Sequence, residues 1–113
     1  MITLYGISNC DTIKKAKRWL DAHAIDYQFH DYRKQGLTRQ QLEVWAEELG
    51  WEGLLNRRGT TWRSLPDEQK QRIDRELAIT LMLEQPAMIK RPLLDLGSSR
   101  KLGFSEADYQ SYF

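Results

Sequence analysis

Hydrophobic positions in the first third of the chain follow two different periods. Residues 2–7 (ITLYGI) form a short apolar run that is typical of a buried strand. From about residue 11 to residue 23 the period becomes helical, and one stripe carries Ile13, Ala16, Leu20 and Ala24. Residues 27–30 (YQFH) alternate apolar and polar side chains, as a second strand would. A helix between two short strands is the usual crossover of a parallel pair, so we predict strand, helix, strand.

The middle of the chain has a helical pattern with clear start and stop residues. Thr38 with Gln41 has the form of a capping box, and Gly50 is placed to end the helix that follows. A second start signal lies at residues 64–67 (SLPD). A helical stripe comes after it, and Pro86 is placed to stop that stripe.

Strand patterns return after Pro86. Residues 92–96 and 100–104 flank a Gly-Ser-Ser turn and predict a hairpin. Ser105 with Asp108 then starts a short last helix. The complete order places the expected fold in the α/β class. We predict a four-stranded mixed sheet with a helical insertion over roughly residues 35–86.

Composition and charge set limits on this picture. The 113 residues suffice for one core and are too few for two independent ones, so we expect a single domain. The 17 basic and 16 acidic side chains leave a net charge of +1. That balance provides no general attraction for nucleic acid or for an anionic membrane, so any basic site must be local.

Cysteine usage and hydropathy bear on the compartment. The single cysteine, Cys10, cannot form an internal disulfide, which favours a reducing environment. No apolar stretch has the length of a membrane span or of a signal peptide. We therefore expect a cytoplasmic protein. His23 and His30 fit no metal-ligand spacing, so we expect no metal site.

Cys10 is the main candidate for chemistry. Its neighbours in the segment GISNCDT are mostly polar, so the sulfur does not lie in an apolar run. It also stands where the first strand ends and the first helix begins, and unpaired N–H groups at a helix start stabilise a thiolate. Lys14, one turn later, could add positive charge. We therefore predict that Cys10 is a nucleophile, with an inert, packed cysteine as the open alternative.

The position of a second cysteine in a Cys-x-x-Cys pair is occupied by Ile13. A dithiol mechanism that closes its own disulfide is therefore excluded in this chain. If Cys10 forms a covalent adduct, an external thiol must resolve it.

Four segments together resemble the arsenate reductase (ArsC) family, in its branch of YffB- and Spx-like proteins with a thioredoxin-like fold. The segments are LYGISNCDTIKKAKRWL, LLNRRGTTWRSL, IKRPLLDLG and LGFSEADY. They occur in the family's order and spacing across essentially the whole chain. The resemblance implies a thioredoxin-like part over residues 1–34 and 87–113, with the helical insertion over residues 35–86 between them.

The resemblance also implies roles for individual residues. It makes Cys10 the nucleophile and assigns Arg91 and Arg58 to binding an oxyanion or its adduct. It places Pro92 where the fold carries a cis-proline. Arginine suits this task because its planar, permanently charged fork matches an oxyanion or a carboxylate. Three residues close to Cys10 in the sequence complete the predicted anion-binding set: Asn9, Thr12 and Lys14.

Two positions depart from the pattern of the true arsenate reductases. Their third arginine falls at Gly103, and the histidine four residues before the cysteine is replaced by Gly6. Arg100 lies near the missing arginine but out of register. These departures favour a larger thiol-bearing substrate, such as glutathione or a glutathionylated partner, over arsenate.

The resulting prediction is a monothiol reductase, with glutathione as external co-substrate and no bound cofactor, acting on a disulfide or a small oxyanion such as arsenate. We expect a monomer that binds neither nucleic acid nor membrane. The alternative is an Spx-like regulator that binds RNA polymerase. Redox-sensing Spx proteins carry a Cys-x-x-Cys pair, and Ile13 stands at the position of its second cysteine. An Spx-like role of this chain would therefore have to be independent of redox state.

Overall fold

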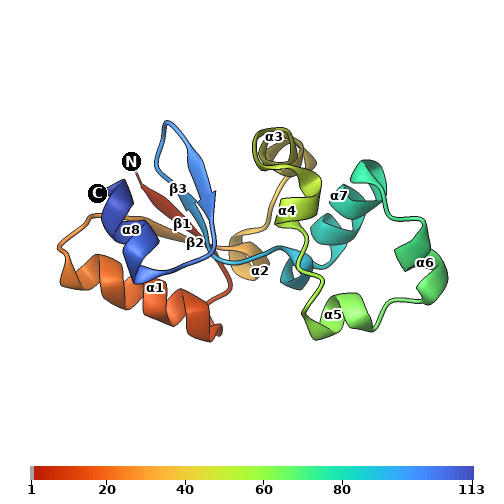
Figure 1. Cartoon of the computed structure of the whole chain (residues 1–113), viewed down its shortest axis with the longest axis horizontal. Coiled ribbons are helices and arrows are strands. Elements are labelled where there is room, and N and C mark those ends of the chain that lie inside the picture. The colour runs from red at the N-terminus through yellow and green to blue at the C-terminus, as the bar shows by residue number, and fades with distance from the viewer. Residues whose placement is uncertain (1) are drawn as a thin grey trace. The chain divides into compact units, whose positions relative to one another are not determined.

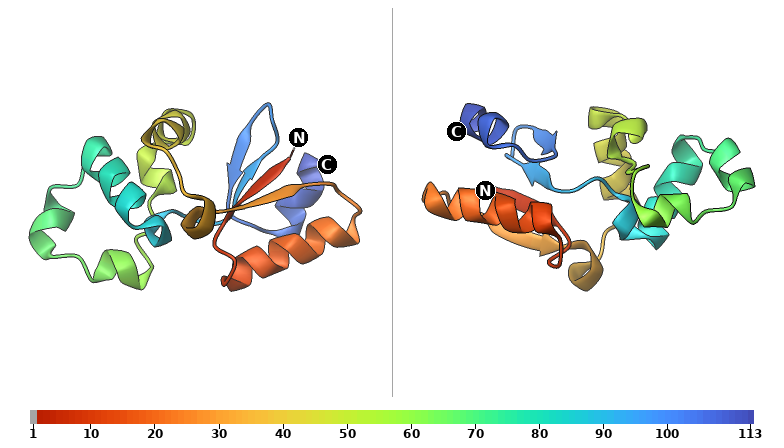
Figure 2. Two further views of the ribbon diagram at one scale, coloured as in Figure 1. Left: turned by 180° about the vertical axis from the view of Figure 1, so that it is seen from behind. Right: turned by 60° about the horizontal axis from the view of Figure 1, so that its bottom comes forward.

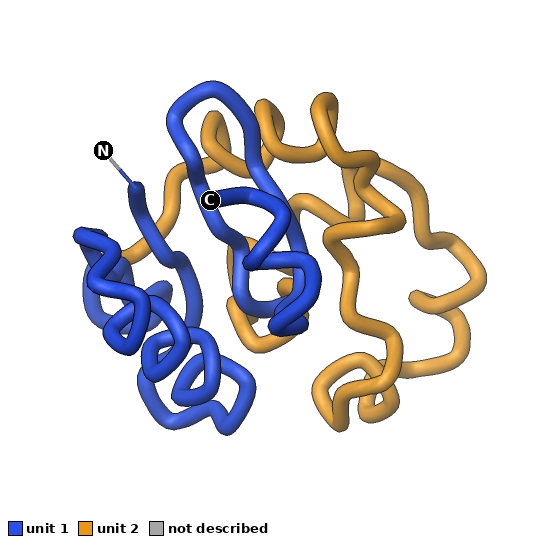
Figure 3. The backbone as a smooth tube through the Cα atoms, turned by 60° about the vertical axis from the view of Figure 1, so that its left-hand side comes forward, with its two compact units in different colours: residues 1–35, 91–113 blue, residues 36–90 orange. Residues whose placement is uncertain are grey.

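The computed structural model describes residues 2–113 and divides them into two compact units (Figure 1, Figure 3). Unit 1 combines the N-terminal segment up to residue 35 with residues 91–113, and unit 2 comprises residues 36–90. The insertion that the sequence placed over residues 35–86 therefore extends to residue 90. The reason is backbone pairing within unit 2, since an isolated β-bridge joins Leu55 to Ile89.

Unit 1 is built on the four-stranded mixed sheet that the hydrophobic pattern predicted. Strand β1 lies in the middle, parallel to β2 and antiparallel to β3, and β4 extends the sheet antiparallel to β3. The strands are β1 (Thr3–Gly6), β2 (Gln28–Asp31), β3 (Leu93–Asp95) and β4 (Arg100–Leu102).

Helices α1 (Asp11–Ala22) and α8 (Glu106–Tyr112) supply the core of unit 1 together with the sheet (Figure 2). Leu4 and Leu94 are direct partners on β1 and β3. They belong to one buried cluster with residues from both helices: Ala16, Trp19, Leu20 and Tyr109. A third helix of unit 1, α2 (Tyr32–Gln35), directly follows β2.

The apolar stripe of α1 is shorter than predicted. The sequence extended it to Ala24, but the helix ends at Ala22, and Ala24 is exposed with a φ of 56°. The chain leaves the helix at His23, whose backbone N–H and ring Nδ1 both bond to the Trp19 carbonyl. A residue in the left-handed region cannot continue a helix, so Ala24 turns the chain toward β2.

The last helix begins as its cap residues predicted. The Ser105 side chain accepts a hydrogen bond from the backbone N–H of Asp108 at 3.0 Å. The ring of Phe104, just before the cap, meets the Tyr109 ring edge-on at 4.7 Å between centroids. The Ser105 cap and the contact of Phe104 with Tyr109, a hydrophobic staple, therefore fix the direction in which the chain enters α8.

Unit 2 is helical, as the insertion was expected to be. Its elements are α3 (Arg39–Leu49), α4 (Trp51–Leu54), α5 (Thr60–Arg63), α6 (Asp67–Gln71), α7 (Arg75–Glu84) and the 3₁₀ turn η1 (Pro86–Met88). The predicted capping box of Thr38 and Gln41 is present at the start of α3. Gly50 ends α3 with a φ of 83°, a conformation that glycine adopts without strain.

Helices α3 and α7 are joined by a polar contact as well as by packing. Arg39 donates to Glu76 at 2.7 Å and to the Thr80 hydroxyl at 3.0 Å. In the described part of the chain, residues 2–113, no helix has both the length and the apolar character needed to cross a membrane.

Candidate functional site

Cys10 occupies the N-cap position of α1 and is half-buried. Its backbone is extended, with φ of −130° and ψ of 130°, and its carbonyl accepts the first helical hydrogen bond from the Lys14 N–H at 3.0 Å. The first N–H groups of α1 are therefore available to the sulfur itself, as expected from its place at the junction of strand and helix.

The environment of the sulfur favours the thiolate. Burial alone would raise the pKa of the Cys10 thiol, since it disfavours the charged form. Hydrogen bonds from the backbone N–H of Ile13, from the Arg91 side chain and from the backbone N–H of Thr12 outweigh that effect, together with the positive charge of Arg91. The net result is a lowered pKa, which is the condition for a reactive cysteine.

Arg91 lies far from Cys10 in the sequence but close to its thiol in the structure. It is half-buried and precedes β3, and its peptide bond to Pro92 is cis. The same guanidinium acts on Tyr32 at the start of α2: burial raises the pKa of that phenol, and the charge of Arg91 opposes the rise. Arg91 therefore connects the thiol with the buried aromatic side chain that follows β2.

Asp31 is a site residue that the sequence did not reveal. It ends β2, is 4% exposed and accepts a hydrogen bond from the backbone N–H of Ser8 at 3.1 Å. Its other oxygen accepts from the N–H groups of Arg33 and Lys34 at 2.8 and 3.2 Å. Burial by itself would raise the pKa of this carboxyl, but these bonds lower it. The carboxylate thus holds the segment leading to Cys10 against the end of β2.

A signal for Asp31 existed in the sequence. An acidic residue directly after a predicted strand needs partners if it is buried, and backbone N–H groups of a neighbouring loop are the usual ones. Which loop supplies them depends on the parallel pairing of β1 with β2, where Gly6 lies opposite Asp31.

The other predicted residues occupy different settings. Asn9 and Lys14 are exposed, and Thr12 contributes its backbone N–H to the sulfur. Arg58 belongs to unit 2, where it precedes α5 and lines a pocket of about 260 Å³. Unit 1 by itself therefore brings together Cys10, Thr12 and Arg91.

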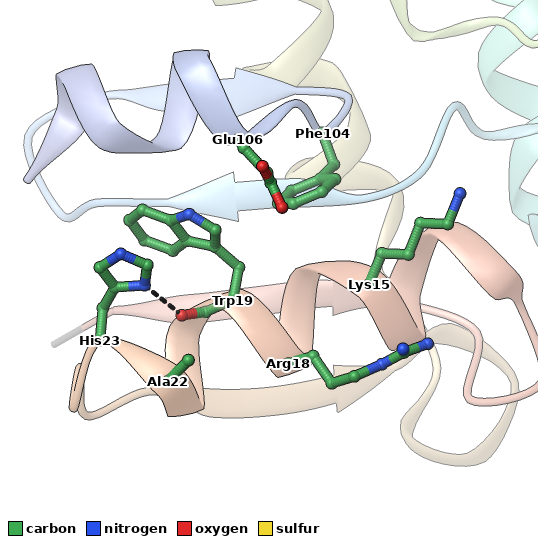
Figure 4. Close-up of a pocket in the computed structure, with 7 residues that line it drawn as sticks. All are labelled: Lys15, Arg18, Trp19, Ala22, His23, Phe104 and Glu106. Carbon is green, nitrogen blue, oxygen red and sulfur yellow. Dashed lines mark hydrogen bonds between the residues drawn. The ribbon is translucent and has the colours of Figure 1, made fainter.

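A further pocket of unit 1, about 570 Å³ in volume, does not include Cys10 or Arg91 (Figure 4). Within it the His23 ring stacks on the Trp19 indole at 3.8 Å between centroids. Its lining consists of Lys15, Arg18, Trp19, Ala22, His23, Phe104 and Glu106. Its lining shares no residue with the group of Cys10, Thr12 and Arg91.

No metal site accompanies the thiol in the described residues. Across residues 2–113 the structure gathers no group of three or more His, Cys, Asp or Glu side chains able to hold a metal ion. The chemistry that the geometry supports is that of a thiolate beside an arginine.

Comparison with known proteins identifies relatives over the whole chain. The family model described as ArsC family matches residues 5–112. The solved structure of a protein named YffB is 50% identical, with a TM-score of 0.94 over 98% of this chain and 97% of its own. An arsenate reductase (ArsC) related protein from Brucella melitensis is 49% identical, with a TM-score of 0.82 over 99% and 93%. These structures confirm the fold class.

A more distant relative carries a different name. The global transcriptional regulator Spx of Streptococcus pyogenes is 25% identical over 114 residues, which is 99% of this chain and 84% of that protein.

Proposed function

The chain belongs to the ArsC family, and on that basis we propose that it is a monothiol reductase with Cys10 as its nucleophile. The observation that carries this proposal is the lowered pKa of the Cys10 thiol, held by backbone N–H groups of α1 and by Arg91. A thiolate at neutral pH attacks disulfides far faster than a thiol does. We place this chemistry in the cytoplasm, where Cys10 stays reduced, and in a monomer without a bound cofactor.

The proposed reaction has two exchange steps. In the first, the Cys10 thiolate attacks the glutathione sulfur of a glutathionylated substrate, the substrate's disulfide bond breaks, and the substrate leaves as a thiolate that takes a proton from water. In the second, the thiolate of free glutathione attacks the same sulfur and releases oxidised glutathione and the Cys10 thiolate. Overall one free glutathione is consumed: its sulfur and the glutathionyl sulfur of the substrate become one disulfide, and the substrate is released with a free thiol.

Arg91 steadies negative charge in both steps. Its fork stabilises the attacking thiolate and can bind a carboxylate of the incoming glutathione. A small oxyanion such as arsenate would use the same arginine. The name of the Brucella melitensis relative supports an oxyanion substrate. Gly103, at the place of a further arginine in the true arsenate reductases, favours a disulfide substrate instead.

A coupled glutathione assay tests the reductase. A glutathionylated peptide is supplied with glutathione, and the oxidised glutathione formed is measured through glutathione reductase. We expect turnover by the native protein, none by Cys10→Ser, and full turnover by Lys34→Gln, an exposed cation on α2. Equal turnover by the native protein and Cys10→Ser would refute the proposal. Arsenate in place of the peptide tests the oxyanion.

The similarity to Spx supports a second candidate, a regulator that binds RNA polymerase. Ile13 in place of a second cysteine requires that this binding be independent of redox state. Capture of purified RNA polymerase by the native protein and by Cys10→Ser, under reducing and oxidising conditions, decides the matter. Equal capture in all four cases supports the regulator, and no capture rules it out.

A further inference from the structure

One face of α1 and the start of α8 enclose the pocket of unit 1 that lies apart from the thiol (Figure 4). Residues at helical spacing lie on one side of a helix, and from Lys15 to His23 this side extends over about 12 Å. Phe104 and Glu106 line the pocket from the α8 side. Its volume of about 570 Å³ is in the range of sites that take a small organic molecule.

The aromatic walls of this pocket are held in place by their neighbours. The Tyr109 ring meets Trp19 edge-on at 5.6 Å between centroids, and it meets Phe104 edge-on at 4.7 Å. Tyr109 is completely buried and Trp19 is 9% exposed, so close packing restricts both rings to one position. The His23 ring is fixed as well, because it stacks on Trp19 and its Nδ1 bonds to the Trp19 carbonyl at 2.8 Å. The aromatic surface is therefore formed before any ligand arrives.

Charges of both signs border this aromatic surface. Lys15 and Arg18 precede Trp19 on α1, and Glu106 lies on the α8 side of the pocket. All three side chains are exposed, and among residues 2–113 none of them forms an ion pair. Lys15 and Arg18 are three residues apart, a spacing at which like charges on a helix repel each other. An anion bound between them would relieve that repulsion.

We propose that the pocket binds a small zwitterionic aromatic molecule, of the chemical class of the aromatic amino acids. The ring of the ligand packs against Trp19 and Phe104, since aromatic rings attract one another in stacked and edge-on arrangements. Its carboxylate faces Lys15 and Arg18, and its ammonium group faces Glu106.

The charges on both sides of the pocket favour a zwitterion over a simple ion. A purely anionic ligand would leave Glu106 unpaired beside it, and a purely cationic one would meet the two basic side chains. The site shares no residue with Cys10, Thr12 and Arg91, so the proposal goes beyond the reductase and does not depend on it.

The experiment titrates ¹⁵N-labelled native protein, kept reduced, with tryptophan. We expect saturable shifts of the Trp19 indole N–H and of the Glu106 backbone amide at millimolar or lower concentration, as is usual for a ligand of this size in an open site. Two probes with the same ring system test the charges. Indolepropionate lacks the ammonium group and tryptamine lacks the carboxylate. Each should bind about threefold more weakly than tryptophan, the usual effect of losing one exposed charge pair.

Charge variants assign each end of the ligand to its side chain. Arg18→Gln should weaken the binding of tryptophan and of indolepropionate about threefold and leave that of tryptamine no weaker. Glu106→Gln should weaken the binding of tryptophan and of tryptamine and leave that of indolepropionate no weaker. The matched controls are Arg72→Gln and Glu47→Gln, which remove exposed charges of unit 2 and should change nothing. Glutathione-dependent turnover should be the same in Arg18→Gln as in the native protein.

A third variant fills the pocket without removing a charge. Ala22→Leu places a larger side chain in the lining, and it should weaken tryptophan binding at least about fivefold. Ala22 is exposed and leucine is a good helix former, so the fold stays intact. Unchanged binding in Ala22→Leu, equal weakening in the controls, or no saturable shift at the two N–H groups would overturn the proposal. Binding of indolepropionate or tryptamine as tight as that of tryptophan would overturn the zwitterion.

Discussion

The side chain of Ile13 fills the space in which any side chain at residue 6 would have to lie. A Cβ placed on Gly6 would be 2.8 Å from Ile13 Cγ1, closer than two carbon atoms approach without one of them moving. Ile13 is completely buried, and its backbone N–H is one of the groups that lower the pKa of the Cys10 thiol. The end of β1 is thus packed directly against the turn of α1 that stabilises the thiolate.

We predict that Gly6→Ala raises the pKa of the Cys10 thiol and destabilises the protein. The added methyl must displace Ile13, which costs about 1–3 kcal/mol in a packed core and shifts the N–H that faces the sulfur. Urea unfolding measures the loss of stability, and the pH profile of iodoacetamide alkylation measures the pKa of the thiol. Gly6→Ala combined with Ile13→Ala should recover the thiol's profile, because the space is then free. An unchanged profile in Gly6→Ala would contradict this account.

Arg91→Ala should also raise the pKa of the thiol. Arg91 lowers that pKa through both a hydrogen bond and its charge, so its loss reduces the thiolate fraction at neutral and mildly acidic pH. Alkylation at pH 6 should slow by up to about tenfold for each pKa unit of the shift. The thiol pKa of Arg91→Lys should lie between those of the native protein and Arg91→Ala. The thiol pKa of Lys34→Gln should equal that of the native protein. Identical titrations of Arg91→Ala and native protein would show that Arg91 does not act on Cys10.

Asp31→Asn should destabilise the protein at neutral pH by about 2 kcal/mol, because a buried carboxylate that accepts several N–H bonds is replaced by an amide. The folded-state pKa of Asp31 is depressed, so its contribution is present above the unfolded pKa of about 3.9 and is lost as pH falls through the folded value. The difference between the two proteins in urea unfolding should therefore shrink from pH 7 to pH 3.

The control for this pH dependence is Asp26→Asn, because Asp26 is exposed. That variant should unfold like the native protein at pH 7. A difference between Asp31→Asn and native protein that stays constant across the pH range would mean that Asp31 acts through packing and not through its charge.

Tyr109→Phe should leave stability unchanged or increase it by up to about 1 kcal/mol. The Tyr109 hydroxyl is buried and makes no hydrogen bond with any of the residues 2–113, so its removal abolishes an uncompensated desolvation cost. The ring contacts with Trp19 and Phe104 are kept. Thermal unfolding of the two proteins measures the effect. A loss above about 1 kcal/mol would show that the hydroxyl has a partner in solution.

The fold was predictable from sequence because its local signals agree with its tertiary contacts. The helical stripe of α1, the capping box at Thr38 and the cap at Ser105 each describe a single element and needed no knowledge of the others. The position of Cys10 at the start of α1 was predictable for the same reason, since the junction of strand and helix is local.

The contacts around Cys10 depend on register as well. Asp31 reaches Ser8 only through the parallel pairing of β1 with β2. Hydrophobic periods indicate that strands exist but do not fix which residues face each other across them.

The pairing of β1 with β3 makes assembly of the surroundings of Cys10 a late event in folding. Leu4 pairs with Leu94, so the sheet closes only after the chain has been synthesised beyond residue 94 and the segment between these strands has been gathered into a loop. Pairings so distant in sequence carry a large closure entropy and form slowly. Arg91 joins Cys10 through the same closure. A nascent chain therefore carries Cys10 without its arginine partner, and Arg91 lowers the pKa of the thiol only once the sheet has closed.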